Sequence, residues 1–429
     1  MIQLALQEAP TPRAGSLGSA DLGHVRPIPR ISIQAFCEGA DFAAIVEKAA
    51  TDRRMSRAHV KVQMGGLAAA AEFYHAAPTP NLILAETHLA GERLIAELDH
   101  LAEVCDAGTK IVIVGRANDV ELYRLLIRRG VSEYLVGPVS APDIIKSIAD
   151  LYLDTGKAPL GRSIAFVGAK GGAGSSMVAH NVAWSIARNL QNEVVIADLD
   201  VAFGTAGLDF NQDPAQGISD AIHSPERLDD TFLDRLLARC SDHLSLLAAP
   251  ATLDRTCDYD ETTFEAMIEV AQNGVPAVIL DIPHVWTAWA RRVLIAADEI
   301  VLTAEPDLAN LRNAKNLLDM LRTLRQGDAP PRLVINKQGM AKRPEIKVAD
   351  FTAALAIEPI AVIGFEPQLF GTAANNGQMI AETDPKSAAA AAFDHIAQIL
   401  TGRVDVKPKR TSALAPLLAR LRSRKSGAA

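Results

Sequence analysis

The sequence predicts an α/β protein made of two doubly wound domains, each with a parallel sheet covered by helices. Short aliphatic runs alternate with helix-like stretches along most of the chain, which is typical of parallel strands joined by crossover helices. The alternation falls into two series, separated by a polar connection with Pro and Gly at residues 154–161. With 429 residues, of which 49% are hydrophobic, the chain is long enough to bury more than one core.

Composition and charge narrow the function. The net charge of −8 argues against binding nucleic acid through bulk charge, so no nucleic-acid partner is expected. The four cysteines lie far apart without a CxxC pair, which favours neither a zinc site nor a disulfide framework. No apolar run approaches the roughly 18 residues of a membrane span, and the first residues do not resemble a signal peptide. We therefore expect a cytoplasmic protein.

Residues 1–30 are predicted to form a flexible arm. They mix Pro, Gly, Ala and Ser without periodicity, and such a composition gains too little from burial to offset the entropy of ordering.

The first series, residues 31–153, is expected to form one domain. Its predicted strands lie at residues 30–36, 80–86, 110–116 and 132–138. Its predicted helices lie at residues 41–50, 91–104, 119–130 and 141–153.

The second series, residues 162–403, is expected to form a larger domain with longer helices. Its predicted strands lie at residues 163–169, 193–200, 243–250, 277–283, 299–306, 331–337 and 359–365.

The last segment, residues 404–429, is a basic tail in an otherwise acidic chain, with seven Lys or Arg against one Asp. Four leucines follow a helical spacing of i, i+3, i+4 and i+7, at Leu414, Leu417, Leu418 and Leu421. A basic amphipathic helix of this kind lies on an anionic membrane or docks in an acidic groove of a partner. The alternative is a tail that only improves solubility.

Residues 168–176 read as a phosphate-binding loop. A strand, a Gly-rich turn and a helix that opens near Ser176 follow one another, so backbone N–H groups and the helix dipole point at one spot. Compared with the pattern GxxxxGK[ST], Ala169 replaces the first Gly and Ser175 replaces the Lys, while Ser176 keeps a hydroxyl suited to Mg²⁺. The alternative is a tight turn without a ligand.

Lys170, early in this loop, resembles the signature lysine of the MinD/ParA class of deviant P-loop ATPases. The resemblance implies that Lys170 reaches the phosphates across a nucleotide-bound homodimer. It also implies that Asp198 supports the water shell of Mg²⁺ and that Asp200 positions the attacking water. Capping of loops by strand-end aspartates is the alternative.

Two further strand ends extend this resemblance. Asp281 ends the apolar run "AVILD", where a Walker B acid binds Mg²⁺ through water. Asn336 matches the position at which MinD-like proteins read adenine with an amide, and a solvated turn is the alternative. The resemblance implies ATP and Mg²⁺ as cofactors. The implied ATP-binding residues are Gly171, Gly172, Ala173, Gly174, Ser175, Ser176 and Asn336. The implied metal-binding residues are Ser176, Asp198 and Asp281, and the implied catalytic residues are Lys170 and Asp200.

Three longer stretches resemble the CpaE/TadZ proteins of tight-adherence (Flp-type) pilus assembly. They lie at residues 281–319, 333–346 and 370–382, the last reading "FGTAANNGQMIAE", and the resemblance covers roughly residues 160–403. It implies an ATP-binding scaffold that dimerises on nucleotide, recruits the secretion and pilus machinery, and associates with the inner membrane at a cell pole. The alternative is a hydrolysing MinD/ParA-type switch that positions cargo at the membrane or pole.

The resemblance to CpaE-type proteins also implies a receiver-like (flavodoxin-like) domain ahead of the ATPase, at residues 31–153. A working receiver needs acids for Mg²⁺, an aspartate that accepts phosphate, a Thr or Ser, and a Lys. At the corresponding positions this chain has Cys37 and Glu38, then Glu86, Gly115 and Gly137. We therefore expect an atypical receiver-like domain used for docking or dimerisation, with a phosphomimetic Glu86 as the alternative.

Ser175 bears on hydrolysis as well as on binding. Loss of the loop lysine removes a charge-assisted contact of about 1.5 to 3 kcal/mol, or roughly 10- to 100-fold in affinity. The same lysine stabilises charge on the transferring phosphoryl group. The sequence therefore predicts ATP binding with weak or no ATPase activity.

Overall fold

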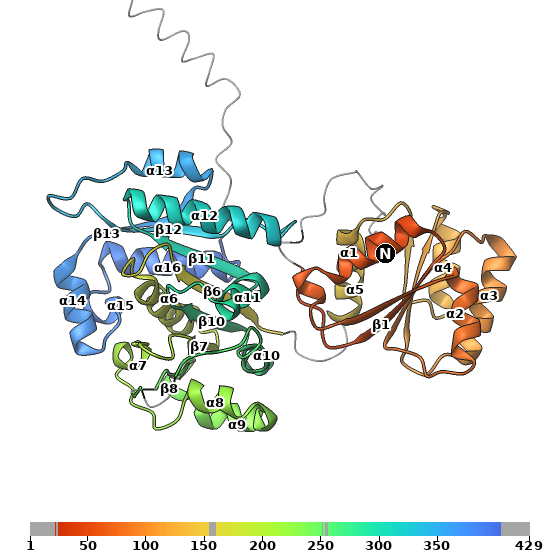
Figure 1. Ribbon diagram of the computed structural model, residues 1–429, viewed down its shortest axis with the longest axis horizontal. Helices are drawn as coiled ribbons and strands as arrows, with labels where there is room; N and C mark the ends of the chain where they lie inside the picture. Colours follow the sequence, from red (N-terminus) through yellow and green to blue (C-terminus); the bar gives the residue numbers. More distant parts are fainter. Residues whose placement is uncertain (1–21, 23–24, 154–159, 251, 254–255, 405–429) are drawn as a thin grey trace, which may run out of the picture.

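The computed structural model describes Leu22 and residues 25–153, 160–250, 252–253 and 256–404. It has two sheets, each covered by helices on both faces, in two domains that lie side by side (Figure 1). This confirms the predicted fold class. The basic tail beyond Val404, most of the predicted arm and residues 154–159 of the predicted linker lie outside the described residues. In the described part of the chain, no helix combines the length and the apolar character needed to span a bilayer.

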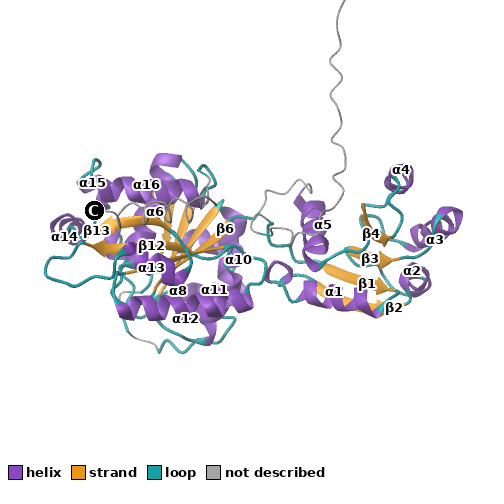
Figure 2. Ribbon diagram, turned by 90° about the horizontal axis from the view of Figure 1, so that it is seen from above, coloured by secondary structure: helices purple, strands orange, loops and turns teal. Residues whose placement is uncertain are grey.

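The amino-terminal domain contains a five-stranded parallel sheet in the order β2-β1-β3-β4-β5, which is the strand order of the flavodoxin-like fold. Its strands are β1 (Ser32–Cys37), β2 (His59–Met64), β3 (Leu82–Glu86), β4 (Lys110–Gly115) and β5 (Glu133–Val136). Its helices are α1 (Ala40–Ala50), α2 (Gly66–Tyr74), α3 (Gly91–Val104), α4 (Val120–Arg128) and α5 (Ala141–Leu153), with the 3₁₀ turn η1 at Arg53–Met55. Helices α1 and α5 cover one face, and α2, α3 and α4 cover the other (Figure 2).

Strand β2 and helix α2 are absent from the sequence prediction. Strand β2 reads "HVKVQM" and forms one edge of the sheet. None of its residues is fully buried, so it lacks the continuous apolar run that marks the inner strands. Helix α2 reads "GLAAAAEFY", and its alanines give little of the contrast between apolar and polar faces on which the prediction depends.

The carboxy-terminal domain contains an eight-stranded sheet in the order β13-β12-β11-β6-β10-β7-β9-β8. The strands are β6 (Arg162–Gly168), β7 (Val194–Asp198), β8 (Ala238–Ser241), β9 (Leu244–Leu247), β10 (Ala277–Ile282), β11 (Glu299–Ala304), β12 (Arg332–Gln338) and β13 (Pro359–Gly364). All pairs are parallel except β8 with β9, an antiparallel edge that the prediction of seven strands did not include.

Helices cover both faces of this sheet, as Figure 2 shows. One layer contains α6 (Ser175–Leu190), α7 (Ala206–Asp209), α14 (Pro367–Asn376), α15 (Ile380–Thr383) and α16 (Ala388–Leu400). The other contains α8 (Ile218–His223), α9 (Asp230–Leu236), α10 (Glu265–Gly274), α11 (Ala288–Ala296), α12 (Leu308–Leu324) and α13 (Val348–Leu355), with the 3₁₀ turn η2 at Pro225–Arg227.

Strand β6 lies inside the sheet between β10 and β11. Helix α6 connects β6 to β7, which lies on one side of β6 in the strand order. The later strands β11, β12 and β13 lie on the other side of β6. The carboxyl end of β6 is therefore the point where the strand order reverses, and doubly wound sheets bind ligands there.

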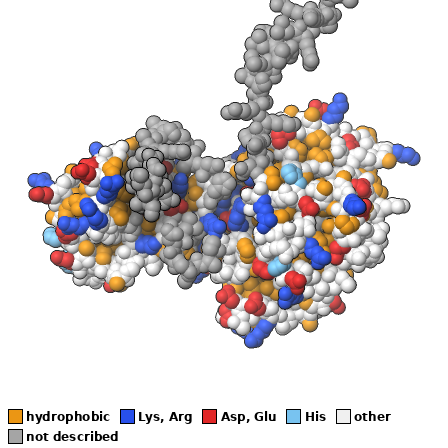
Figure 3. Space-filling model, turned by 180° about the vertical axis from the view of Figure 1, so that it is seen from behind, with side chains coloured by type: hydrophobic (Ala, Val, Ile, Leu, Met, Phe, Trp, Pro, Cys, Tyr) orange, Lys and Arg blue, Asp and Glu red, His pale blue; other side chains and the backbone are white. Residues whose placement is uncertain are grey.

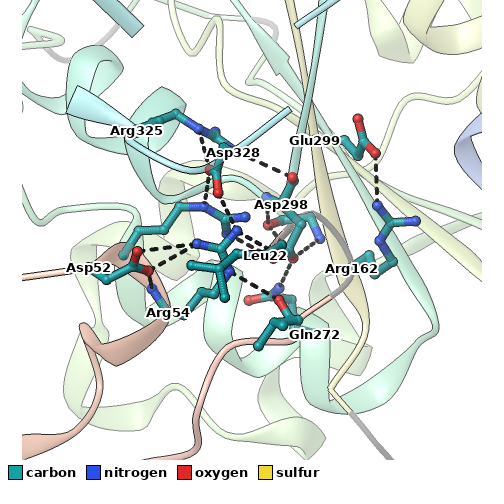
Figure 4. Close-up of polar contacts among 12 residues, drawn as sticks. Leu22, Asp52, Arg54, Arg162, Gln272, Asp298, Glu299, Arg325 and Asp328 are labelled. Atoms are coloured by element: carbon teal, nitrogen blue, oxygen red, sulfur yellow. Dashed lines mark hydrogen bonds and ion pairs between the residues drawn. The ribbon is translucent and has the colours of Figure 1, made fainter. Parts of the chain in front are cut away.

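The two domains are joined by a buried cluster of charges (Figure 4). Arg53 Nη1 lies 3.1 Å from Asp298 Oδ1, and Arg53 Nε lies 2.7 Å from Asp328 Oδ2. Arg54 also pairs with Asp328, which a third arginine, Arg325, approaches to 2.8 Å. Since Asp298 directly precedes β11, the cluster lies at the amino edge of the large sheet, opposite the carboxyl end of β6.

The end of the predicted arm packs against this joint. Leu22 and Ile28 are buried, and the carbonyl of Leu22 accepts a hydrogen bond of 2.8 Å from Arg54 Nη2. Ile28 donates its N–H to the carbonyl of Arg54 at 2.8 Å. These residues differ from the expectation of a flexible arm because their apolar side chains complete a core whose other half comes from the folded domain.

Candidate functional site: a phosphate loop beside buried carboxylates

The phosphate loop connects β6 to α6 at the carboxyl edge of the large sheet. Gly172 and Gly174 have φ of +82° and +86°, a left-handed conformation that L side chains rarely adopt. The N–H of Ala173 closes a turn onto the carbonyl of Lys170 at 3.1 Å, and α6 begins directly at Ser175. The loop therefore delivers its backbone to the amino end of a long helix, where anions bind.

Side chains from the turn after β10, from α12 and from β12 hold the loop by its carbonyl groups. His284 Nδ1 lies 3.0 Å from the carbonyl oxygen of Gly168. The remaining donors are Asn313 Nδ2 to Ala169 at 3.0 Å, Asn336 Nδ2 to Ala173 at 2.9 Å, and Lys337 Nζ to Gly172. Because its carbonyls are engaged by these donors, the loop is fixed in one conformation before a ligand arrives.

Two carboxylates lie side by side at the adjoining strand ends. Asp198 ends β7 and Asp281 lies on β10, and the two are register partners in the sheet. Asp198 accepts hydrogen bonds from the N–H groups of Asp200 at 3.2 Å and Ala206 at 3.1 Å. Burial, followed by the charge of Asp281, raises the pKa of Asp198 to about 7. Gly204 makes this packing possible, since a Cβ there would lie 2.2 Å from Asp198 Oδ2.

Among the buried oxygen atoms that have no hydrogen-bond partner in the described residues are Asp281 Oδ1 and Ser175 Oγ, which belong to the carboxylate pair and to the loop. A buried polar atom without a partner is costly, and a hydrated cation or a phosphate would satisfy it. These residues therefore fit a magnesium ion that keeps most of its water, held beside a phosphate. Ser176, in the first turn of α6, carries the second hydroxyl of the site.

His180 is a member of the site that the sequence analysis missed. It lies one and a half turns into α6 and is fully buried. Its Nδ1 hydrogen-bonds to Asp209 Oδ2 at 2.7 Å, and its Nε2 lies 3.3 Å from Asp281 Oδ2. The imidazole thus joins a metal-site candidate to the end of α7. No sequence motif identifies it as a site residue, because a lone histidine on an apolar helix face has no characteristic pattern.

Asp200 and Lys170 lie at the open side of the site. The carboxylate of Asp200 accepts a hydrogen bond of 3.1 Å from the N–H of Phe203, and burial raises its pKa. Lys170 is exposed. Asp200 thus follows Asp198 in the same strand-end turn, whereas Lys170 belongs to the exposed part of the loop.

Asn336 is buried against the phosphate loop. Its side-chain NH₂ donates to Ala173, as described above, and its oxygen accepts from the N–H of Lys337 at 2.9 Å. Gly174 leaves the space for it, since a Cβ at that position would lie 2.5 Å from Asn336 Nδ2. A contact between Asn336 and adenine stays a prediction.

An apolar surface borders the loop. The turn after Asp281 exposes Val285 and Trp286, with 59% of Trp286 accessible. Together with Leu317 and Met320 of α12, they line a cavity of about 450 Å³ that reaches the loop at Gly168. On the face drawn in Figure 3, hydrophobic, basic and acidic side chains are interspersed over both domains.

No protein-family model matches the chain. The septum site-determining protein MinD of Synechocystis is 24% identical over 254 residues, which are 57% of this chain and 91% of that protein. MinD of Neisseria meningitidis serogroup B is 25% identical over 255 residues, 56% of this chain and 92% of that protein.

Solved structures show the fold of the larger part of the chain. A ParA family ATPase from Chlorobium tepidum is 22% identical, with a TM-score of 0.51, over 56% of this chain and 99% of that chain. MinD from Pyrococcus horikoshii, solved with Mg-ADP, is 18% identical with a TM-score of 0.51, over 58% of this chain and 100% of that chain. At these identities the likeness shows the MinD/ParA fold alone.

Two pilus assembly proteins are much more similar in sequence. CpaE from Caulobacter crescentus is 53% identical, over 30% of this chain and 97% of the solved chain, with a TM-score of 0.29. CpaE2 from Sinorhizobium meliloti is 40% identical, over 28% of this chain and 99% of the solved chain, with a TM-score of 0.28. Sequence identity over nearly the whole of each solved chain, and not the TM-score, relates this chain to them.

Proposed function

Because the chain belongs to the family of the CpaE pilus assembly proteins, we propose that it is an ATP-binding scaffold for the assembly of tight-adherence (Flp-type) pili. One observation carries the proposal. A preformed phosphate loop with a serine at position 175 lies beside a buried carboxylate, Asp281, one oxygen of which has no hydrogen-bond partner among the described residues. This combination supports binding of a nucleotide with Mg²⁺ and disfavours its rapid hydrolysis.

The roles of the site residues follow from their chemistry. The backbone N–H groups of Gly171–Ser176 would bind the phosphates. The hydroxyl of Ser176 and, through water, the carboxylates of Asp198 and Asp281 would hold Mg²⁺. When bound, Mg²⁺ neutralises charge on the phosphate oxygens. Asn336 would lie near the base, because it packs on the same loop from the side of β12.

Weak turnover follows from Ser175. A serine hydroxyl supplies no positive charge to the transferring phosphoryl group. That charge is a main contribution of the usual loop lysine to catalysis. Asp200 would still orient a water molecule. We therefore propose that the protein remains in its nucleotide-bound state for a long time and does not pass through a fast hydrolytic cycle.

Dimerisation is part of the same proposal. Lys170 is exposed at the loop and would be available to a second nucleotide site, as the MinD/ParA resemblance implies. The exposed Val285 and Trp286 beside the loop support a protein contact, since a large apolar side chain near a ligand site marks an interaction surface. The dimer would then recruit the secretion and pilus machinery.

A hydrolysing switch of the MinD/ParA type is the second candidate. It is favoured by the presence of both Lys170 and Asp200 at the open side of the site. The two candidates differ in the rate at which phosphate is released.

The test measures binding and turnover on one sample. Calorimetric titration with Mg-ATP and a phosphate-release assay are run on the wild type, on Lys170→Ala and on the control Lys315→Ala. Lys315 is a half-exposed lysine of α12 paired with Asp319, so its replacement removes the same charge away from the loop. We expect wild-type binding with little phosphate release, and loss of binding in Lys170→Ala only.

Rapid phosphate release by the wild type would favour the switch. Absence of wild-type binding would contradict both candidates and leave the loop as a turn without a ligand.

A further inference from the structure

Lys337 reaches the phosphate loop from a different strand. It lies near the carboxyl end of β12, in the left-handed conformation with φ of +53°, which is uncommon for a residue other than Gly. Its Nζ donates to the carbonyl oxygen of Gly172 and, at 2.9 Å, to Glu305 Oε1. Its Cε would lie 3.9 Å from a Cβ built on Gly174. The side chain therefore runs alongside the loop between Gly172 and Gly174.

The ammonium group is held by a second charge pair. Glu305 also pairs with Arg343, whose Nη2 donates to the carbonyl oxygen of Lys337 at 3.2 Å. Although burial opposes it, hydrogen bonds from Lys337 and Arg343 lower the pKa of Glu305, so its carboxylate is ionised at neutral pH. One carboxylate is thus shared by two cations, and Arg343 also pairs with a second carboxylate, Glu345, at 3.4 Å.

The loop itself has little positive charge. Within residues 168–176 the sole basic side chain is that of Lys170, which is exposed. Ser175 occupies the position of the usual lysine, and its Oγ is buried without a partner in the described part of the chain. A left-handed, non-glycine residue that sends a cation to the same loop is a costly arrangement, and such arrangements cluster at functional sites.

We propose that Lys337 supplies the positive charge that Ser175 does not, and that it is a positioning residue for bound phosphates. It acts in two ways. Its bond to Gly172 keeps that carbonyl turned out of the loop, which leaves the N–H groups free for an anion. Its charge, only partly offset by Glu305, stabilises the negative charge of a triphosphate, and this attraction grows as the nucleotide displaces water.

This inference rests on the proposed nucleotide binding, and the test separates the two. Calorimetric titration with Mg-ATP and with inorganic tripolyphosphate is run on the wild type, Lys337→Met, Ser175→Lys and the double variant. Lys337→Met is expected to weaken both ligands roughly 10-fold, because the charge acts on phosphates and not on the nucleoside. In the double variant, a lysine at position 175 is expected to restore most of the lost affinity.

Two controls keep the outcome clear. Lys347→Met removes an exposed lysine ten residues further along the chain and should leave both affinities unchanged. Lys337→Arg keeps the charge and should bind as the wild type, which separates lost charge from lost folding if Lys337→Met is unstable.

Each contrary result has one meaning. No wild-type binding would overturn the proposed function. Wild-type binding that Lys337→Met leaves unchanged would overturn this inference alone. A loss in Lys337→Met that Ser175→Lys does not repair would show that Lys337 only braces the loop, and would also overturn it.

Discussion

At the scale of single residues, the hydrogen bonds of Glu86 bear on the role of the amino-terminal domain. It ends β3, where a receiver would carry its phosphate-accepting aspartate. Its Oε2 accepts the N–H groups of Glu38 at 2.8 Å and Gly39 at 2.9 Å, just before α1 begins. The side chain of Glu86 therefore binds the backbone of the two residues that lead into α1. This engagement supports a structural role for Glu86 over a free acceptor site.

Replacing Glu86 tests that role. Glu86→Ala leaves two partly buried N–H groups without an acceptor, which is expected to cost about 1 to 3 kcal/mol of unfolding free energy. Urea denaturation measures the loss. Glu72→Ala, an exposed glutamate of α2, is the matched control and should change little. An unchanged midpoint in Glu86→Ala would show that these hydrogen bonds are dispensable.

At the scale of elements, α6 does more than present the phosphate loop. The helix is buried along most of its length, and His180 fixes it to α7 through Asp209 and to β10 through Asp281. Although burial alone would favour the neutral ring, hydrogen bonds to the two aspartates raise the pKa of His180 to about 10. A protonated imidazole then lies between two carboxylates and offsets part of their charge, which links the three elements electrostatically.

Removal of this imidazole should be costly. His180→Leu keeps an apolar side chain in the helix and leaves Asp209 and Asp281 without their shared partner. Breaking one side of a buried charge pair typically costs about 3 to 5 kcal/mol. Chemical denaturation followed by far-UV circular dichroism measures the change, with the exposed His395→Leu of α16 as the control. Equal stabilities of the two variants would contradict the role assigned to His180.

At the scale of the whole molecule, a buried cluster of charges joins the two domains. Asp328 accepts Arg53, Arg54 and Arg325, and its side chain is 4% exposed. Against the effect of burial, these arginines lower the pKa of Asp328. The unfolded chain therefore binds more protons than the folded one, and the stabilisation is present above pH about 3.8 and lost as the pH falls below it.

Asp328→Asn should loosen the joint without unfolding either domain. Arg53 then keeps its pair with Asp298 and Arg54 its pair with Asp52, while Arg325 loses its pair with Asp328. The wild-type protein should respond in the same way when acidified below pH about 4. Small-angle X-ray scattering is expected to show a larger radius of gyration for Asp328→Asn at pH 7. The exposed pair partner Asp319→Asn of α12 is the control. An unchanged radius in Asp328→Asn would mean that other contacts hold the domains together.

Much of the fold could be predicted because its signals are local. The inner strands are continuous apolar runs, and the loop from Gly168 to Ser176 has its glycines within a few residues of each other. The strand-end residues Asp198, Asp281 and Asn336 could be proposed for the same reason. The edge strands β2 and β8 were missed, since a strand that is half exposed carries a weaker apolar pattern.

Two α/β domains could be predicted from the sequence alone, and so could a glycine-rich loop between a strand and a helix, with Ser175 at the position of the usual lysine. Only the tertiary structure decided which side chains meet at that loop. Asn313, Asn336 and Lys337 are 144, 163 and 165 residues from their loop partners. The joint likewise connects residues 245 to 275 positions apart. No local pattern encodes such contacts, because they exist only once the parallel strands have brought their carboxyl ends to one edge of the sheet.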